Sequence, residues 1–410
     1  MNRRTFLHGA TAAAGAMLLP ATTAEDPDKL FKQGNFAGAE RAYRRQLRKD
    51  ERNARAHAQI GYIALLSNRF RVAETHLTKA IELSPRDIAS TQRLAECFVR
   101  QDRLSSAVPL LRRTGRPRDT AYAEMFSAIS GKPWQISGAR SARLPFLTVD
   151  PVPFVEASIN GGKRQPFILD TYATLDLSQE AADAAGLRAV ATQPGGVVDG
   201  QEVVLSFGVL DSFKVGGIEI RNLPVQWNPV KRPTLPNGTD PAGAFGTTIF
   251  YHFLTTMDYA GKTLELRRTP GPERGKLGRL PLWLAGDHFP CTLGTLGDYG
   301  PTTVTVDTGG IASALDITVE NAERVGFKVD YEHPNDRFGR SYPVTAHKLS
   351  LGRAVRRNVV GTAVEKPGPG MPAPGHSEQF GFDLMANFTH EFFKPFAITF
   401  DYTRMRLSID

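Results

Sequence analysis

The chain has 410 residues, of which 41% are hydrophobic and 22% charged, and its formal net charge is +8. This length exceeds one ordinary hydrophobic core, so two or three domains are expected, and the apolar content excludes a disordered chain. Residues 25–119 hold the excess charge, with 20 Lys and Arg against 12 Asp and Glu, but acids are mixed among them without interleaved aromatic side chains, so we expect no nucleic-acid binding.

The first 24 residues have the pattern of a twin-arginine export signal. Arg3 and Arg4 precede a mildly apolar run rich in Ala, Gly and Thr, and the small residues of 21–24 suit cleavage. The run is shorter than the roughly 20 apolar residues that span a bilayer. We therefore expect a cleaved signal, not an uncleaved anchor, with no stable membrane insertion afterwards and a periplasmic or secreted location.

Residues 25–113 carry a helical repeat, with the first unit truncated. Three apolar positions recur at intervals of 34 residues: Phe36, Phe70 and Leu104; Ala39, Ala73 and Ala107; and Tyr43, Leu77 and Leu111. This period, with Gly61 in a tight helix contact and Pro85 after a helix, resembles the tetratricopeptide repeat. Stacked repeats share a core and leave a concave face, so the resemblance implies either a protein or peptide partner there or a spacer or dimerisation module.

The helical pattern stops before the second half of the chain. Residues 114–143 lose the periodicity and contain Gly131-Lys132-Pro133, so we expect a linker there. From Leu144 onward apolar residues recur at every second position, and Gly, Pro and Asn separate short strands about every ten residues. This pattern predicts an all-β region.

The all-β region contains a duplication, whose two copies are residues 144–270 and 271–410. The landmarks of the first copy are Phe167–Thr171, Ala185-Gly186-Leu187, Arg221-Asn222-Leu223, Ala244-Phe245-Gly246 and Met257-Asp258-Tyr259. The second copy has, in the same order, Val304–Thr308, Val325-Gly326-Phe327, Arg357-Asn358-Val359, Gln379-Phe380-Gly381 and Phe400-Asp401-Tyr402. Nearly equal gaps separate the landmarks, so the sequence predicts two homologous lobes.

The segment Val304–Ala314 reads VTVDTGGIASA and resembles the catalytic loop of retropepsin-like and pepsin-like aspartic peptidases. With the duplication, the resemblance implies a bilobal, all-β double barrel. It also implies site residues: Asp170 and Asp307 as the catalytic dyad, Thr171 and Thr308 as a pair between the lobes, and Gly309 as a backbone donor. Such a dyad shares one proton and activates a water molecule against a polypeptide substrate, without cofactor or metal.

The first loop departs from this pattern. It has Tyr172 where the second loop has Gly309, and it is three residues shorter, because Asp176 follows Asp170 by 6 residues whereas Asp316 follows Asp307 by 9. Displacement of the Asp170 carboxyl would leave a catalytically inactive peptide-binding or scaffold protein.

A further alternative is a homodimer in which two Asp307 loops from separate chains form the dyad. The covalent duplication argues against it, and the sequence does not fix the oligomeric state.

Two glycine-containing segments and four further acids lie near the landmarks of the two copies. Gly195-Gly196 near Gly200, and Phe338-Gly339 near Tyr342, fall where each lobe would carry a flap hairpin or a plain turn. The other acids near the landmarks are expected to be structural: Asp258 and Asp401 in turns, and Asp176 and Asp316 in caps or turns.

Other chemistry lacks support in the sequence. Cys97 and Cys291 fall in different predicted domains, so we expect two buried thiols and no disulfide. The chain contains no His-Glu-x-x-His or Cys/His cluster with metal-ligand spacing, and no Gly-x-Ser-x-Gly.

Overall fold

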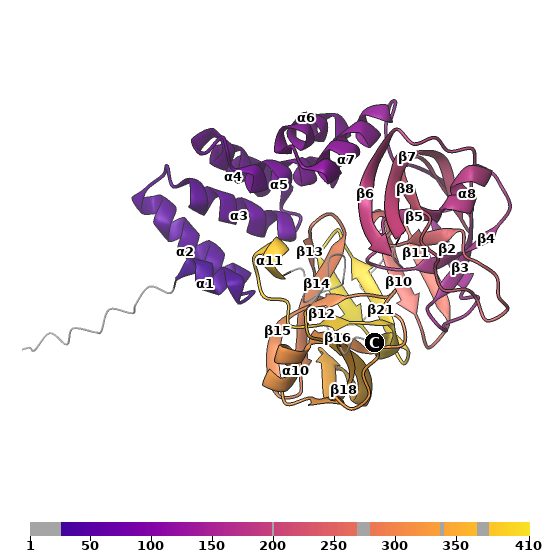
Figure 1. The fold of residues 1–410 in the computed structure, drawn as a ribbon. Coiled ribbons are helices and arrows are strands. Elements are labelled where there is room, and N and C mark those ends of the chain that lie inside the picture. Colours follow the sequence, from indigo (N-terminus) through magenta and orange to yellow (C-terminus); the bar gives the residue numbers. More distant parts are fainter. Residues whose placement is uncertain (1–25, 199–200, 269–278, 337–339, 367–376) are drawn as a thin grey trace, which may run out of the picture.

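The computed structural model describes residues 26–198, 201–268, 279–336, 340–366 and 377–410. An arc of helices is followed by two β-lobes that share a central sheet (Figure 1). The predicted export signal, residues 1–24, lies outside the described residues. None of the helices in the described ranges is long and apolar enough to cross a membrane.

The helical arc is built from helix pairs, as the repeat predicts. Its helices are α1 (Pro27–Lys32), α2 (Phe36–Lys49), α3 (Ala54–Leu66), α4 (Phe70–Leu83), α5 (Ile88–Val99), α6 (Leu104–Thr114) and α7 (Pro117–Ala128). Side chains cap the starts of α2, α3 and α5, where Asn35, Asn53 and Asp87 each accept a hydrogen bond from the N–H three residues later. Local sequence thus fixes where these helices begin.

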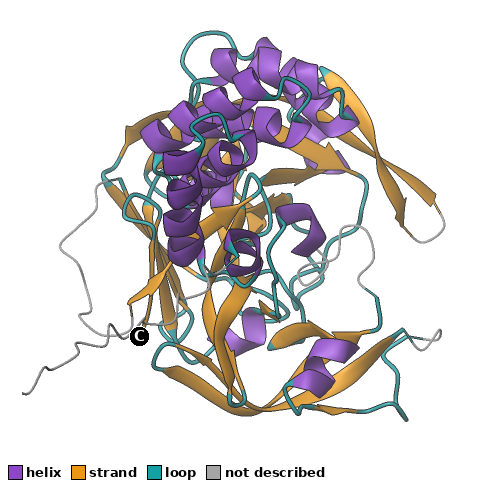
Figure 2. Cartoon of the chain, turned by 90° about the vertical axis from the view of Figure 1, so that its left-hand side faces the viewer, coloured by secondary structure: helices purple, strands orange, loops and turns teal. Residues whose placement is uncertain are grey.

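Small residues stand where the helices cross. Ala39, Ala73 and Ala107 are completely buried. A Cβ atom at Gly61 of α3 would lie 2.7 Å from Leu77 Cγ of α4, too close for any side chain. The tetratricopeptide-like stacking predicted for these residues is therefore confirmed, and Figure 2 shows the stacked helices covering one side of the β-lobes.

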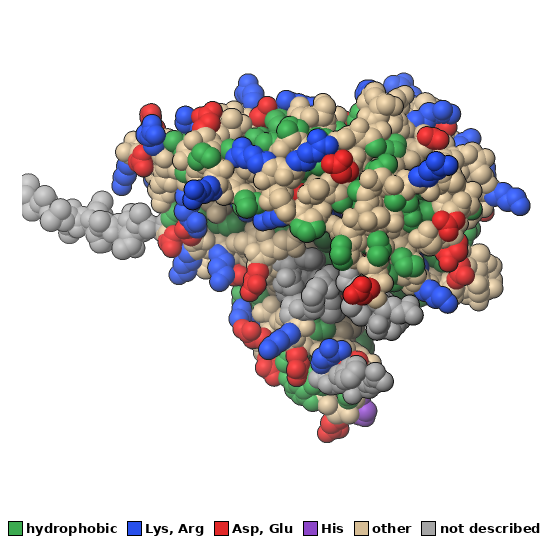
Figure 3. Space-filling view, turned by 45° about the horizontal axis from the view of Figure 1, so that its top comes forward, with side chains coloured by type: hydrophobic (Ala, Val, Ile, Leu, Met, Phe, Trp, Pro, Cys, Tyr) green, Lys and Arg blue, Asp and Glu red, His purple; other side chains and the backbone are tan. Residues whose placement is uncertain are grey.

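Charges of both signs are spread over the face of the helical arc seen in Figure 3. Ion pairs also link neighbouring helices, such as Arg69 with Glu40 and Arg103 with Glu74. The basic excess of this part of the chain is therefore mixed with acids on that face, as the sequence predicts.

Residues 114–143 are more ordered than the predicted linker. They contain α7, strand β1 (Gln135–Gly138) and the start of β2 (Ser141–Pro145). Pro117 begins α7, and its side chains Ala121, Ala123 and Phe126 are buried against α6 and the first lobe. Because α7 is enclosed on several sides, it has no one-sided apolar stripe, and its sequence lacks the usual helical signal.

The first lobe is a closed β-barrel with two short helices. Its elements are β3 (Phe154–Ile159), β4 (Gln165–Leu169), β5 (Leu175–Ser178), α8 (Gln179–Ala184), β6 (Ala191–Val198), β7 (Gln201–Val215), β8 (Ile218–Asn228), β9 (Gly243–Phe245) and α9 (Thr247–Phe250). The strand order is β1-β8-β5-β9-β4-β3-β7-β6, and pairing of β7 with β8 closes the barrel. The β6–β7 hairpin lies where the sequence suggested a flap, and residues 199–200 between these strands, including Gly200, are outside the described ranges.

The second lobe repeats this topology. Its elements are β13 (Trp283–Ala285), β14 (Phe289–Leu296), β15 (Tyr299–Val306), β16 (Leu315–Thr318), α10 (Val319–Arg324), β17 (Lys328–Val329), β18 (Ser341–Leu351), β19 (Ala354–Val364), α11 (Ser377–Phe380), β20 (Asn387–Phe388) and α12 (His390–Phe393). Pairing of β14 with β18 closes its sheet. The second suggested flap includes Phe338-Gly339, which lie outside the described residues.

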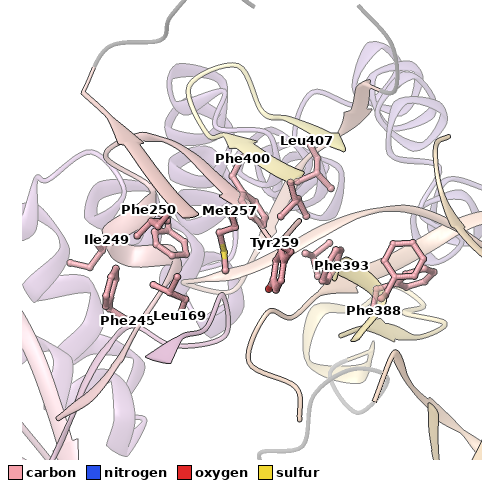
Figure 4. Close-up of a cluster of buried hydrophobic side chains, with 14 of the residues drawn as sticks. Leu169, Phe245, Ile249, Phe250, Met257, Tyr259, Phe388, Phe393, Phe400 and Leu407 are labelled. Carbon is pink, nitrogen blue, oxygen red and sulfur yellow. The ribbon is translucent and has the colours of Figure 1, made fainter. Parts of the chain in front are cut away.

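A central six-stranded sheet joins the lobes. It contains β2, β10 (Leu254–Asp258), β11 (Thr263–Arg267), β12 (Arg279–Pro281), β21 (Ala397–Asp401) and β22 (Arg406–Ile409). In the antiparallel pair β10–β21, Thr256 faces its equivalent Thr399, and their hydroxyls lie 2.8 Å apart. The lobes are therefore related by an approximate two-fold axis between these residues, and Figure 4 shows apolar side chains continuing from one lobe to the other.

One predicted equivalence is wrong. Phe245 of β9 pairs with Leu169, and the residue that pairs in the same way in the second lobe is Phe388, beside Val306. The counterpart of Ala244-Phe245-Gly246 is thus Asn387-Phe388-Thr389, not Gln379-Phe380-Gly381. Helix α11 ends at Phe380, and the sequence Phe380-Gly381 resembles Phe245-Gly246 but lies seven residues before the true counterpart of Ala244.

The inner face of the helical arc contacts the second lobe. Phe31 of α1 and Phe36 of α2 lie against Phe382, and the ring of Phe36 lies 4.9 Å from that of Trp283. These side chains belong to one buried cluster with Tyr62 and Cys291. The concave face that tetratricopeptide-like repeats offer is therefore covered here by the chain's own β13–β14 hairpin and by residues near 380–384.

Two arginines hold the turn of this hairpin. Arg100, at the end of α5, donates hydrogen bonds to the carbonyl oxygens of Leu284 and Gly286, at 2.8 and 2.6 Å. Arg118 of α7 lies 2.7 Å from Asp287. Burial opposes ionisation of Asp287, but Arg118 and His288 outweigh it and hold the pKa of this carboxyl well below its ordinary value.

We expect Asp287→Ala to loosen the helical arc from the second lobe. Arg118 and His288 would lose their anionic partner at a partly buried site, where the Asp287 side chain is 21% exposed, so the free energy of unfolding should fall by about 2 kcal/mol. Urea denaturation at neutral pH measures this. Glu320→Ala, which removes an exposed ion pair on α10, is the control with no measurable change; equal effects of the two variants would contradict the prediction.

Candidate active site

Two equivalent loops bring the predicted dyad together at the junction of the lobes. Asp170 follows β4 and Asp307 follows β15. Thr171 Oγ1 accepts a hydrogen bond from the Thr308 N–H and donates one to the Val306 carbonyl oxygen, at 3.0 and 2.7 Å. Thr308 Oγ1 makes the mirror-related bonds with the Thr171 N–H and the Leu169 carbonyl, at 3.0 and 3.1 Å. The predicted cross-lobe pair thus locks the loops to each other.

The Asp170 and Asp307 carboxyls lie within hydrogen-bonding reach of each other. Each is also held by its own loop: the Tyr172 N–H donates to Asp170 Oδ1 at 2.7 Å, and the Gly309 N–H donates to Asp307 Oδ1 at 2.9 Å. Neither Tyr172 nor the shorter first loop therefore removes Asp170 from its position.

Glycine is required in one loop and not in the other. A Cβ atom at Gly309 would lie 2.2 Å from Asp170 Cγ, so a side chain there would displace the opposite carboxyl. Tyr172 instead packs its ring edge-to-face on Phe289, with centroids 4.9 Å apart. The extra residues of the second loop fall at its tip, where Ala312 has a left-handed backbone with φ of 55°.

The two carboxyls differ in their electrostatic setting. Burial and the charge of Asp307 raise the pKa of Asp170 well above its ordinary value. Burial also raises the pKa of Asp307, but hydrogen bonds from Asn387 and the Gly309 amide oppose this rise. One proton between two close carboxyls is the state expected of such a pair, with the negative charge favoured on Asp307.

Asp176 and Asp316 do not cap helices, so one of the two roles expected for them is wrong. Ser178 and Thr318 cap α8 and α10. Asp176 accepts hydrogen bonds from the backbone and hydroxyl of Thr174, both at 3.1 Å, which fits the turn role. Asp316 accepts a bond from Asn387 Nδ2 at 3.2 Å.

Two other sequence expectations are confirmed. Asp258 and Asp401 are structural, because each accepts a backbone hydrogen bond within its own turn, from Gly261 and Arg404. Cys97 and Cys291 are both free thiols and both buried.

Sequence reasoning missed Asn387. This side chain is fully buried, and its Nδ2 donates to Asp307 Oδ2 at 2.9 Å as well as to Asp316. The signal that could have identified it is the register of β20 against β15, which the misplaced Phe380-Gly381 equivalence concealed.

One group of metal-type ligands occurs within the described ranges. Donor atoms of Asp150, His390 and Glu391 lie within 4.8 Å of one another. Lys394 Nζ lies 2.5 Å from carboxylate oxygens of both Asp150 and Glu391. An ammonium group thus already pairs with both carboxylates of this cluster.

Comparison with known proteins supports part of this description. The family model described as "Aspartyl protease" matches residues 155–249, which lie in the first lobe. The chain therefore contains an aspartic-peptidase-like domain. A search of curated proteins found no match.

Among solved structures, the chain is similar to an O-GlcNAc transferase mutant of Thermobaculum terrenum. The identity is 18%, the TM-score is 0.24, and the match covers 26% of this chain and 21% of that one. It is also similar to the TPR2B-domain:pHsp70 complex of yeast Sti1, with 20% identity, a TM-score of 0.21, and coverage of 23% of this chain and 74% of that one. The chain spans about a fifth of the length of the transferase.

The setting of Asp316 predicts a pH-dependent stability. Burial and the charge of Asp307 raise the pKa of Asp316 to about 7. The pKa of an Asp side chain in the unfolded chain is about 4. Between these values unfolding releases the proton, so the contribution of Asp316 to the free energy of unfolding falls as pH rises from about 4 to about 7.

We therefore expect Asp316→Asn to flatten the fall in stability across this window. Asp170 contributes in the same direction, so part of the slope remains. Urea denaturation of parent and variant at about pH 4.5 and about pH 7.5 measures the change. Asp183→Asn, at an exposed carboxylate of α8, is the control, and parent-like slopes in both variants would rule out this account of Asp316.

Proposed function

We propose that this chain is an exported aspartic-type endopeptidase that hydrolyses peptide bonds through Asp170, Asp307 and an activated water molecule. The observation that carries the proposal is the meeting of two equivalent carboxyls, the buried Asp307 and the partly buried Asp170, across crossed threonine hydrogen bonds. Asp-Thr sequences occur in many turns, but a pair that shares one proton is the arrangement that aspartic peptidase chemistry needs.

The donors around the dyad suggest the roles of the two acids. Asp307 accepts a proton from water as the water oxygen attacks the carbonyl carbon of the peptide bond. Asp170 donates its proton to the carbonyl oxygen, so that the tetrahedral intermediate carries two hydroxyl groups. Asp307 then gives its proton to the departing amine nitrogen, while Asp170 takes a proton from one hydroxyl of the intermediate, whose oxygen becomes the carbonyl oxygen of the new carboxyl group. The C–N bond breaks, and one proton again lies on the pair. No cofactor or metal is needed in these steps.

The helical repeats support the lobes in this proposal. Their inner face holds the β13–β14 hairpin, and α7 packs on the first lobe near Phe207 of β7, whose ring lies 5.5 Å from that of Tyr122. A protein partner at the repeats would therefore use their outer surface or displace this hairpin. The pattern of residues 1–24 supports export to the periplasm or secretion.

The dyad can be tested directly. We expect Asp307→Asn and Asp170→Asn each to lower kcat/KM for an unfolded protein substrate by at least about 10³-fold, because either variant removes the shared proton arrangement. The parent should cleave faster in acid and be inhibited by a statine-type peptide, which imitates the tetrahedral intermediate.

Asp183→Asn is the matched control and should cleave at the parent rate. Cleavage at the parent rate by Asp307→Asn would refute the assignment. Peptide binding by the parent without cleavage would instead support a catalytically inactive, peptide-binding protein.

A further inference from the structure

The two lobes differ at one buried pair of side chains next to the dyad. In the second lobe, Asn387 of β20 pairs in register with Thr305 of β15 and with Asp316 of β16. In the first lobe, the equivalent positions are Ala244, Ile168 and Asp176. A polar Thr–Asn pair thus stands in one lobe where the other has an apolar Ile–Ala pair.

The orientation of the Asn387 amide is fixed by its neighbours. Its Oδ1 accepts a hydrogen bond from Thr305 Oγ1 at 2.9 Å, and its Nδ2 faces Asp307 and Asp316 at 2.9 and 3.2 Å. A flipped amide would point its oxygen at both carboxyl groups and lose the bond from Thr305. The two amide hydrogens are therefore committed to these two acids.

This amide makes the dyad unequal. Asp307 accepts hydrogen bonds from the Gly309 N–H and from Asn387, whereas Asp170 accepts one from the Tyr172 N–H. Ala244, the equivalent of Asn387, has no donor to offer Asp170. A buried carboxylate is stabilised by each hydrogen bond that it accepts, so the charge is better accommodated on Asp307.

We infer that Asn387 is a positioning residue that keeps Asp307 ionised and leaves the shared proton on Asp170. The inference rests on the proposed function for its catalytic meaning, because it names which acid activates water and which protonates the substrate carbonyl. The geometric part of the inference depends only on the hydrogen bonds that Asn387 of β20 makes.

The other charged and titratable groups around the pair do not replace this donor. Asp176 and Arg232 face Asp170 from the first lobe, Asp316 faces Asp307 from β16, and Tyr259 lies near both acids. Arg232, the one cation of this set, has a buried Nη1 with no hydrogen-bond partner. Arg232 acts on Asp170 through its charge, while Asn387 donates a hydrogen bond to Asp307 directly.

The test compares Asn387→Leu with Gln226→Leu. Gln226 donates to Asp176, the first-lobe equivalent of Asp316, so its replacement removes a similar amide that does not touch the dyad. Loss of one hydrogen bond to a charged group should raise the lower pKa of the dyad by about one to two units in Asn387→Leu. Gln226→Leu should leave it unchanged.

Two readouts separate this inference from the proposed function. The first is ¹³C NMR titration of the aspartate carboxyl groups, which needs no turnover. The second is the pH profile of kcat/KM, whose acid limb should move upward by the same amount while KM changes little.

The outcomes are distinguishable. A raised carboxyl pKa in a protein that cleaves nothing would support the inference and refute the peptidase proposal. An active, folded Asn387→Leu whose acid limb and carboxyl titration match the parent would overturn the inference alone. If Asn387→Leu does not fold, Thr305→Val, which only frees the amide to turn, should show a smaller shift in the same direction, and an unchanged titration there would equally overturn the inference.

Discussion

Four hydrogen bonds, two from Thr171 and two from Thr308 to the opposite loop, hold the two lobes together at the candidate site. Each threonine hydroxyl accepts from the other loop's backbone and donates to the strand that leads into that loop. Since both hydroxyls are completely buried, these bonds are protected from competition with water. The distance between the two carboxyls is thus set by the backbone of both lobes and not by flexible side chains.

The duplicated lobes have diverged around this shared centre, and each departure is accommodated locally. Tyr172 keeps the backbone donor that glycine would provide and sends its ring to Phe289. Thr389 stands where the first lobe has Gly246, and the longer second loop leaves room for it, with Gly310 lying against its side chain. The second lobe has also gained Asn387. Divergence of this kind gives two equivalent acids different hydrogen-bond partners without moving them.

Much of this arrangement can be read from the sequence, and the failures have physical causes. The 34-residue period predicted the helix crossings because small residues at Ala39, Ala73 and Ala107 are required there. The dyad was predicted because the Asp-Thr loops are local and repeated. Helix α7 was missed because it is buried on several sides, and Asn387 because its importance arises from strand register between residues 82 positions apart. Contacts at such separations leave no periodic pattern in a single sequence.

The β13–β14 hairpin has a consequence for how the chain matures. The helices are synthesised first, yet the apolar groove formed by Phe31, Phe36 and Tyr62 is covered by residues that follow more than two hundred positions later, including Trp283 and Phe382. Until the second lobe is synthesised, the helices of a nascent chain therefore expose an apolar surface that can aggregate. The earliest segment reaches its final packing only after the latest has been made, so a chain truncated before Trp283 would leave this apolar groove uncovered.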